Sequence, residues 1–139
     1  MSGEPRRIDQ LPRAEALRLL GTVSFGRVVF MQRGQPAIRI VNHLVDGGNI
    51  IVRTSEWSEL ASAASGGPVL GYEVDEIDPE RHVGWSVAVR GPAQEVSEPD
   101  HRDEYLERLS TWAPGRRDFV IRIDPAFVSG VRLVEATGD

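Results

Sequence analysis

The residues best suited to chemistry in this sequence are an arginine and three hydroxyl groups in one short stretch. Arg53 lies in an apolar run that has the composition of a strand, and Thr54, Ser55 and Ser58 follow it closely. A guanidinium, hydroxyl groups and the N-terminus of a following helix can together bind a phosphate group. The stretch therefore suggests an anion site, although an arginine that interrupts a strand can also simply face water on a half-exposed sheet.

The composition excludes several other chemistries. All 16 basic residues are Arg and there is no Cys, so a Schiff base, a lysine-bearing phosphate loop and a thiolate site are impossible. The three histidines, His43, His82 and His101, are not at metal-ligand spacing, and we expect no metal site. A formal net charge of −5 argues against general binding of nucleic acid.

The elements that must position these groups are mostly strands. Helices are expected over residues 11–21, 56–65 and 98–112, with Ser97 as the cap of the last. Strands are expected over residues 27–31, 37–45, 50–54, 69–74, 85–96, 119–123 and 127–133, with an acidic turn over 75–84. Because turns join these strands, and not regular helical crossovers, the pattern favours an antiparallel barrel with peripheral helices.

A length of 139 residues suits a single domain spanning 1–139. Residues 1–10 are expected to form a flexible N-terminal arm. The chain does not begin with the apolar segment of a secretory signal, and no apolar run approaches the ~20 residues that a membrane helix needs. We therefore expect a cytoplasmic protein with no membrane partner.

Several short motifs, taken in order, resemble those of actinobacterial proteins of the pyridoxamine 5'-phosphate-oxidase-like family. The similarity covers residues 11–134, and the order and spacing of the motifs together are specific. The motifs are residues 25–28 (FGRV), 34–43 (GQPAIRIVNH), 51–60 (IVRTSEWSEL), 72–75 (YEVD) and 84–91 (GWSVAVRG).

The resemblance implies a mainly β fold, a six-stranded antiparallel split β-barrel of the FMN-binding flavin-reductase type. It also implies a homodimer that shares its cofactor sites across the interface. The cofactor would be FMN, with the deazaflavin coenzyme F-420, haem or no cofactor as alternatives. The activity would be flavin- or deazaflavin-dependent oxidation or reduction of a small molecule.

Carried over by position, two groups of residues would hold this cofactor. The isoalloxazine ring would lie beside Val41, Asn42 and His43. The phosphate would be bound by Arg53, Thr54, Ser55, Ser58 and Glu59. Trp85 would contact the ring or the partner subunit, and apolar positions in the strand from Trp85 to Val89 would be left for that partner to cover.

The sequence departs from the family at the implied site. Glu59 replaces a basic residue, and a carboxylate beside a phosphate is repulsive by ~1 kcal/mol or more unless a neighbouring arginine compensates. Ile40 and His43 replace a Pro and a Tyr of the family's motif. These changes leave three hypotheses: an oxidoreductase, a non-catalytic binder of a flavin-type ligand, and a barrel dimer that has lost its cofactor site.

No catalytic residue is assigned, because a flavin performs the hydride chemistry itself while the protein orients it. His43 is the one side chain that could deliver a proton near the ring. The alternative is that His43 is packed in the core or faces solvent.

Overall fold

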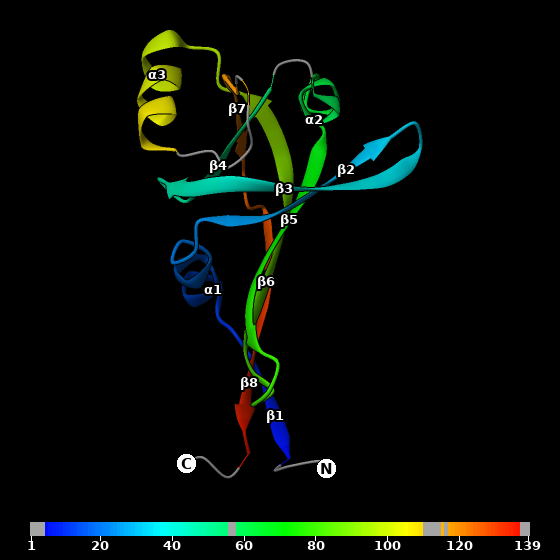
Figure 1. The fold of residues 1–139 in the computed structure, drawn as a ribbon, viewed down its shortest axis with the longest axis vertical. Helices are drawn as coiled ribbons and strands as arrows, with labels where there is room; N and C mark the ends of the chain where they lie inside the picture. The colour runs from blue at the N-terminus through cyan, green and yellow to red at the C-terminus, as the bar shows by residue number, and fades with distance from the viewer. Residues whose placement is uncertain (1–4, 56–57, 110–114, 116, 137–139) are drawn as a thin grey trace.

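In the computed structural model, which describes residues 5–55, 58–109, 115 and 117–136, the chain is dominated by antiparallel strands (Figure 1). The elements in order are β1 (Arg6–Gln10), α1 (Arg13–Leu20), β2 (Phe25–Gln32), β3 (Gln35–Asp46), β4 (Asn49–Thr54), α2 (Glu59–Ala63), β5 (Val69–Asp78), β6 (Val83–Glu95), α3 (Pro99–Arg108), β7 (Phe119–Ile123) and β8 (Phe127–Glu135).

Six of these strands close into a barrel. The sheet order is β1-β8-β6-β5-β2-β3-β4-β7, and an additional pairing of β6 with β7 joins its two parts into a ring. The predicted six-stranded split barrel is therefore confirmed. Strands β8 and β1 lie outside the ring and lengthen it into a narrow stalk, where the described ends of the chain lie side by side (Figure 1).

Strand β6 makes the closure possible because it changes partners midway. It pairs with β5 and β8 as far as Pro92 and Arg90, and with β7 from Ala93 onward. Gly91 lies at this change of partner. A Cβ atom on Gly91 would lie 1.5 Å from the carbonyl oxygen of Asp124, so only glycine allows the two segments to approach so closely.

The barrel interior is a single apolar core. It includes Val28, Phe30, Leu70 and Val87, each at most 2% exposed, and helix α1 packs against β8 and β6 beside it. A second cluster lies under α3, where Tyr105 and Leu109 pack with residues of the barrel wall. The two clusters hold the strands and helices in fixed positions around the end of β3.

Several boundaries differ from the sequence prediction. Residues 6–10 are not a flexible arm but form β1, which pairs with β8 along its whole length. The strand was not predicted because its sequence, RRIDQ, lacks the alternation of apolar and polar residues that is typical of strands. The acidic turn is shorter than expected, since β5 runs on to Asp78 and β6 begins at Val83. Helix α3 is capped by Glu98, not by Ser97: its carboxylate accepts the N–H groups of Asp100 and His101.

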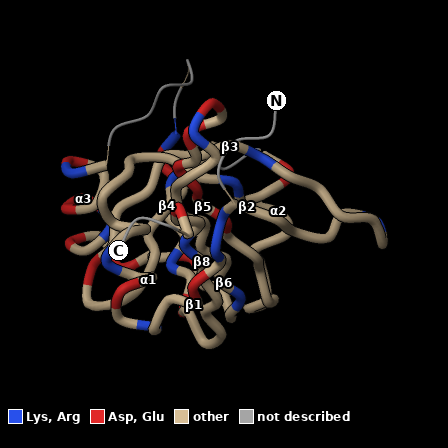
Figure 2. Tube along the Cα trace, turned by 90° about the horizontal axis from the view of Figure 1, so that it is seen from below, with Lys and Arg blue, Asp and Glu red and all other residues tan. Residues whose placement is uncertain are grey.

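Charge is distributed unevenly over the fold. Residues of both signs cluster along α1 and α3, whereas the projecting β2–β3 hairpin is mostly uncharged (Figure 2). Between Phe25 and Ile40 that hairpin contains three arginines and no carboxylate. In the part of the chain that the structure describes, no helix is long and apolar enough to cross a membrane.

Candidate functional site

A polar cluster forms where β4 ends and α2 begins. The Thr54 hydroxyl donates to the Ser58 hydroxyl oxygen over 3.1 Å, and that oxygen also accepts the N–H of Ala61 over 3.0 Å. Ser58 is thus the cap of α2, and the Ser55 carbonyl accepts its N–H over 3.0 Å. Three of the predicted phosphate-site residues, Thr54, Ser55 and Ser58, are therefore brought together.

Glu59 has an arginine partner that the sequence analysis did not assign to the site. The Arg39 guanidinium, from β3, donates to the Glu59 carboxylate over 2.6 Å, and both side chains are half exposed. Arg39 also lies over the Phe30 ring, 5.7 Å from its centre. The carboxylate that would repel a phosphate is therefore neutralised by a neighbouring cation.

Arg53 has a different use from the phosphate contact that the family resemblance implies. Its guanidinium donates to the carbonyl oxygens of Leu106, Leu109 and Arg117 at 2.7–3.1 Å. A carboxylate oxygen of Asp118 lies 3.8 Å away, and the Arg53 side chain is only 14% exposed. Arg53 therefore fastens the end of α3 and the start of β7 to β4.

Strand β3 has one edge that no strand occupies over part of its length. Residues 35–42 pair with β2, and pairing with β4 begins only at His43. In the described ranges, no strand pairs with the other edge of residues 35–42, so main-chain donors and acceptors remain available there. This edge carries Arg39 and the predicted ring-side residue Val41, which is half-buried against the core.

The other two predicted ring-side residues are held by their own chain. Asn42 is buried, and its side-chain amide donates to the Ser24 carbonyl over 3.3 Å. His43 is 5% exposed and engages both ring nitrogens, Nε2 with the Leu20 carbonyl at 2.9 Å and Nδ1 with the Tyr72 hydroxyl. Of the two environments proposed for His43, the packed core position is the one observed.

These contacts determine the protonation of His43. A carbonyl can only accept, so Nε2 carries the hydrogen and Nδ1 accepts the O–H of Tyr72. Burial lowers the pKa of His43 and raises that of the Tyr72 hydroxyl, and both groups are therefore neutral at pH 7. The pair is a saturated hydrogen-bond unit with no free proton-transfer position.

Trp85 is the first of three buried apolar side chains that alternate along β6. Trp85, Val87 and Val89 point into the core and are 6%, 1% and 1% exposed. The expectation that these apolar positions are left for a partner to cover was therefore wrong. Alternation along the strand exposes Ala88 and Arg90 instead.

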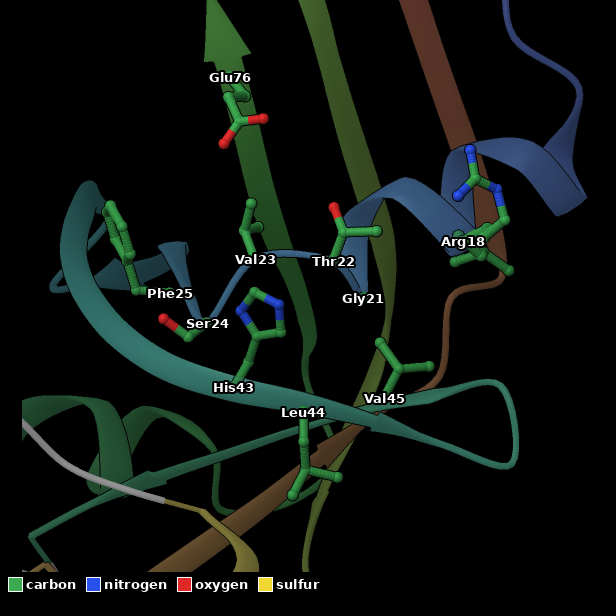
Figure 3. Close-up of a pocket in the computed structure, with 11 residues that line it drawn as sticks. Arg18, Gly21, Thr22, Val23, Ser24, Phe25, His43, Leu44, Val45 and Glu76 are labelled. Atoms are coloured by element: carbon green, nitrogen blue, oxygen red, sulfur yellow. The ribbon is translucent and has the colours of Figure 1, made fainter.

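A separate cavity of about 780 Å³ lies between α1, the loop that follows it, β3 and β5. His43 and Val45 project from β3 toward that loop, whereas Leu44 points to the opposite side of the strand (Figure 3). Arg18 and Glu76 contribute charge at the cavity, and Arg18 already pairs with Glu15 over 2.7 Å. Of the residues predicted for the site, His43 alone lines this cavity.

The structure adds two residues that the sequence analysis did not place in the site. Arg39 and Tyr72 were each included only as part of a family motif. The sequence could have indicated that Arg39 belongs to the site, because strand alternation puts Arg39 on the same side of β3 as Val41 and His43. No cluster of three or more His, Asp or Glu side chains that could hold a metal occurs in the described residues.

A sequence profile of the pyridoxamine 5'-phosphate oxidase family matches residues 12–132. An uncharacterized protein of Mycobacterium tuberculosis is 44% identical over 133 residues, which cover 93% of this chain and 88% of that protein.

Solved structures show the same architecture. An FAD-binding protein of Mycobacterium smegmatis is 29% identical with a TM-score of 0.72, over 91% of this chain and 97% of that one. An FAD-binding protein of Mesorhizobium loti has a TM-score of 0.77 over 94% of this chain and all of that one, at 19% identity. The second likeness concerns the fold alone.

Proposed function

The chain belongs to the pyridoxamine 5'-phosphate oxidase-like family, and from this premise we propose that it binds a flavin-type cofactor along the free edge of β3. The observation that carries the proposal is the juxtaposition of this edge with Arg39, Thr54 and Ser58. The edge supplies main-chain donors and acceptors for the polar rim of a ring. The guanidinium and hydroxyls supply the partners that a phosphate requires.

The donor set fits this ligand chemically. Arg39 is the cation of the cluster, and Thr54 and Ser58 provide hydroxyls held by β4 and the cap of α2. When bound, a flavin supplies hydride-transfer chemistry, and the protein binds and orients it. Val41, half-buried beside the same edge, offers an apolar surface for a ring. Asn42 and His43 would contribute through the strand that they stabilise.

Glu59 is expected to set the strength of phosphate binding. Its carboxylate occupies Arg39 at 2.6 Å, so an incoming phosphate must share or displace that contact. Since the pair is half exposed, breaking it costs only about 0.2–1 kcal/mol. We therefore infer that binding is weakened by Glu59 but not abolished.

The identity of the cofactor is the next step of the proposal. FMN is the flavin that the sequence motifs favour, while the 29%-identical Mycobacterium smegmatis protein binds FAD. The deazaflavin coenzyme F-420 and haem are the alternatives. The test is an absorption spectrum of the purified protein, before and after incubation with excess FMN, FAD, F-420 or haem and gel filtration. Retained flavin bands would support the proposal, and a featureless spectrum with all four would contradict it.

We further propose that the bound flavin acts in an oxidoreductase on a small molecule, with a non-catalytic flavin binder as the second candidate. The second candidate is favoured by His43, because both of its ring nitrogens are hydrogen-bonded within the chain and neither is free to exchange a proton with a ligand. Turnover separates the two. A flavin-loaded protein that oxidises NADH or NADPH with an added electron acceptor would be an enzyme. A loaded protein that binds without turnover would be a binder.

A further inference from the structure

A smaller cavity lies where the start of β4 meets the ends of β6 and β7. It has a volume of about 210 Å³ and is lined by Asn49, Pro92, Gln94, Arg122 and Asp124. Asn49 begins β4 and Thr54 ends it, so at about 3.3 Å per residue the cavity lies about 17 Å from the hydroxyl cluster of the candidate flavin site. The two sites are therefore separate.

The polar side chains of this cavity face the outside of the barrel. In β7, Ile121 and Ile123 are fully buried in the core, so alternation turns the intervening Arg122 outward. Gln94 of β6 pairs with Arg122 in the register, and paired residues point to the same side. Asp124 follows two positions after Arg122 and lines the same cavity. The fold thus brings a cation, a carboxylate and an amide together.

Arg122 is half-buried and is positioned by its neighbours. Its partner in β4 is the buried Ile51, which packs with Tyr105 of α3. The Tyr105 hydroxyl donates to the Asp46 carboxylate over 2.7 Å. Burial and Asp46 raise the pKa of Tyr105, whereas Arg122 beside the hydroxyl opposes the rise. A side chain that is already held in this way loses less conformational freedom when it binds a ligand.

The polar groups of the cavity have unused hydrogen-bonding capacity. Among the residues that the structure describes, no carboxylate forms an ion pair with Arg122, and the side chains of Asn49, Gln94 and Asp124 have no hydrogen-bond partner. Arg122 and Asp124 thus present opposite charges that do not neutralise each other. Residues two apart in an extended chain are separated by about 6.6 Å, which a short ligand carrying both charges can bridge.

We propose that this cavity binds a small free α-amino acid as a zwitterion. The ligand carboxylate accepts hydrogen bonds from the Arg122 guanidinium, whose planar fork suits a carboxylate. It also accepts N–H groups of the Asn49 and Gln94 side-chain amides. The ligand ammonium group donates to the Asp124 carboxylate. The proposal does not depend on flavin binding.

Charge and size favour this ligand class over others. A simple anion would be repelled by Asp124, and a simple amine would be repelled by Arg122; a zwitterion satisfies both residues. A volume of about 210 Å³ corresponds to about seven water molecules at ~30 Å³ each, the size of an amino acid with about six or seven non-hydrogen atoms, such as alanine or serine. The cavity is smaller than the pockets of about 300–1,000 Å³ that hold drug-sized ligands.

The test is a titration of the isotope-labelled full chain with L-alanine, followed by NMR. We expect saturable shifts of the Asn49 and Gln94 side-chain amides, with a Kd of about 1 mM or tighter. Propionate lacks the ammonium group and ethylamine lacks the carboxylate. Each should bind at least about tenfold more weakly than L-alanine, because each leaves one charged hydrogen bond unmade.

Two substitutions separate the roles of the two charges. Arg122→Met keeps an apolar stem and should weaken L-alanine binding about tenfold or more. Asp124→Asn keeps the shape of the side chain without its charge and should abolish the preference for L-alanine over propionate. Arg33→Met and Asp103→Asn, at exposed positions in the β2–β3 turn and on α3, are the matched controls and should bind L-alanine as the wild type does.

Far-UV circular dichroism shows whether each variant folds. If Arg122→Met does not fold, Gln94→Ala tests the exposed rim of the same cavity and should also weaken L-alanine binding. The proposal would be overturned if glycine, L-alanine and L-serine all failed to give saturable shifts at ~20 mM, about twenty times the expected Kd. Equal binding of L-alanine and propionate by the wild type, or an unchanged preference in Asp124→Asn, would overturn it as well.

Discussion

The hydrogen bond between Tyr72 and His43 can be tested by removing one oxygen atom. Tyr72 is 1% exposed and His43 5%, and Tyr72→Phe keeps the ring while leaving Nδ1 of His43 without a donor. An unsatisfied buried acceptor costs about 1–3 kcal/mol. Water has little room to replace the hydroxyl, since a Cβ on the neighbouring Gly26 would lie only 2.7 Å from it.

Urea denaturation followed by circular dichroism measures this loss directly. The free energy of unfolding should fall by about 1–3 kcal/mol with an unchanged dependence on urea. For a chain of this size, the loss corresponds to a decrease in Tm of about 3–10 °C. Tyr105→Phe is the matched control, since the Tyr105 hydroxyl donates to the partly exposed carboxylate of Asp46. It should cost about 1 kcal/mol or less.

The same histidine makes stability depend on pH. The pKa of His43 is lowered in the folded chain by burial, so the unfolded chain takes up a proton near pH 6.5 before the folded chain does. Its contribution to stability is therefore complete above about pH 6.5 and decreases as the pH falls, by at most about 1.4 kcal/mol per pH unit.

Glu73 acts in the opposite direction. Its pKa is raised to about 7 in the folded chain, so its stabilising contribution is present below about pH 4.5 and is lost as the pH rises through 7. The His43 effect should therefore be measured in a Glu73→Gln background. A loss below 0.5 kcal/mol for Tyr72→Phe (less than the roughly 1 kcal/mol minimum for an unsatisfied buried acceptor) would refute the reasoning. So would the same stability at pH 5.5 and pH 8 in the Glu73→Gln background.

Three further substitutions test other parts of the account. Arg53→Met removes three hydrogen bonds to main-chain carbonyls and should lower the free energy of unfolding by about 2–4 kcal/mol in urea; an unchanged midpoint would contradict its structural role. Gly91→Ala places a Cβ 1.5 Å from the Asp124 carbonyl oxygen. We expect the free energy of unfolding to fall by more than about 3 kcal/mol, or the protein not to fold. A variant with wild-type thermal stability would show that residues 91 and 124 do not lie so close together. Glu59→Gln removes a negative charge that repels a bound phosphate by about 1 kcal/mol, so FMN should bind about fivefold more tightly in a fluorescence titration. Weaker binding would show that the carboxylate helps to hold the ligand.

The fold was largely predictable because apolar alternation and turn residues marked most strands. Phe119–Ile123 was predicted with its observed bounds, and the strands predicted over residues 27–31 and 37–45 lie within β2 and β3. The short strand β1 was missed because its five residues are mostly charged or polar. Its pairing with β8 comes from tertiary contacts, including two hydrogen bonds from the Arg6 guanidinium to the Arg81 carbonyl oxygen.

The candidate site was predicted less well, for a reason that strand geometry explains. Arg53 and Thr54 were grouped because they are adjacent in sequence, yet adjacent residues of a strand point to opposite sides. Thr54 therefore joins Ser58, while Arg53 faces α3. The cation that does reach the cluster, Arg39, is 20 residues from Glu59, and only the tertiary structure brings these two residues together.

The same limitation applies to the exposed apolar side chains on the outer face of the sheet, the face opposite the barrel core. The sequence predicted uncovered apolar positions in the strand from Trp85 to Val89, but these side chains point inward. The exposed apolar residues lie on five different strands, and β-sheet register is needed to recognise that they share one side. No local sequence pattern determines the register between strands that are distant in the chain.

The central claim is that the free edge of β3 binds a flavin ring and that Arg39 binds the flavin phosphate. Its most direct test is a fluorescence titration of FMN. Wild-type protein, Arg39→Met and the control Arg33→Met should be compared under identical conditions. We predict saturable binding to the wild type and to Arg33→Met, and at least about tenfold weaker binding to Arg39→Met, since a charged hydrogen bond contributes about 1.5–3 kcal/mol. Equal affinity for Arg39→Met and the wild type, or no FMN binding by the wild type, would contradict the account.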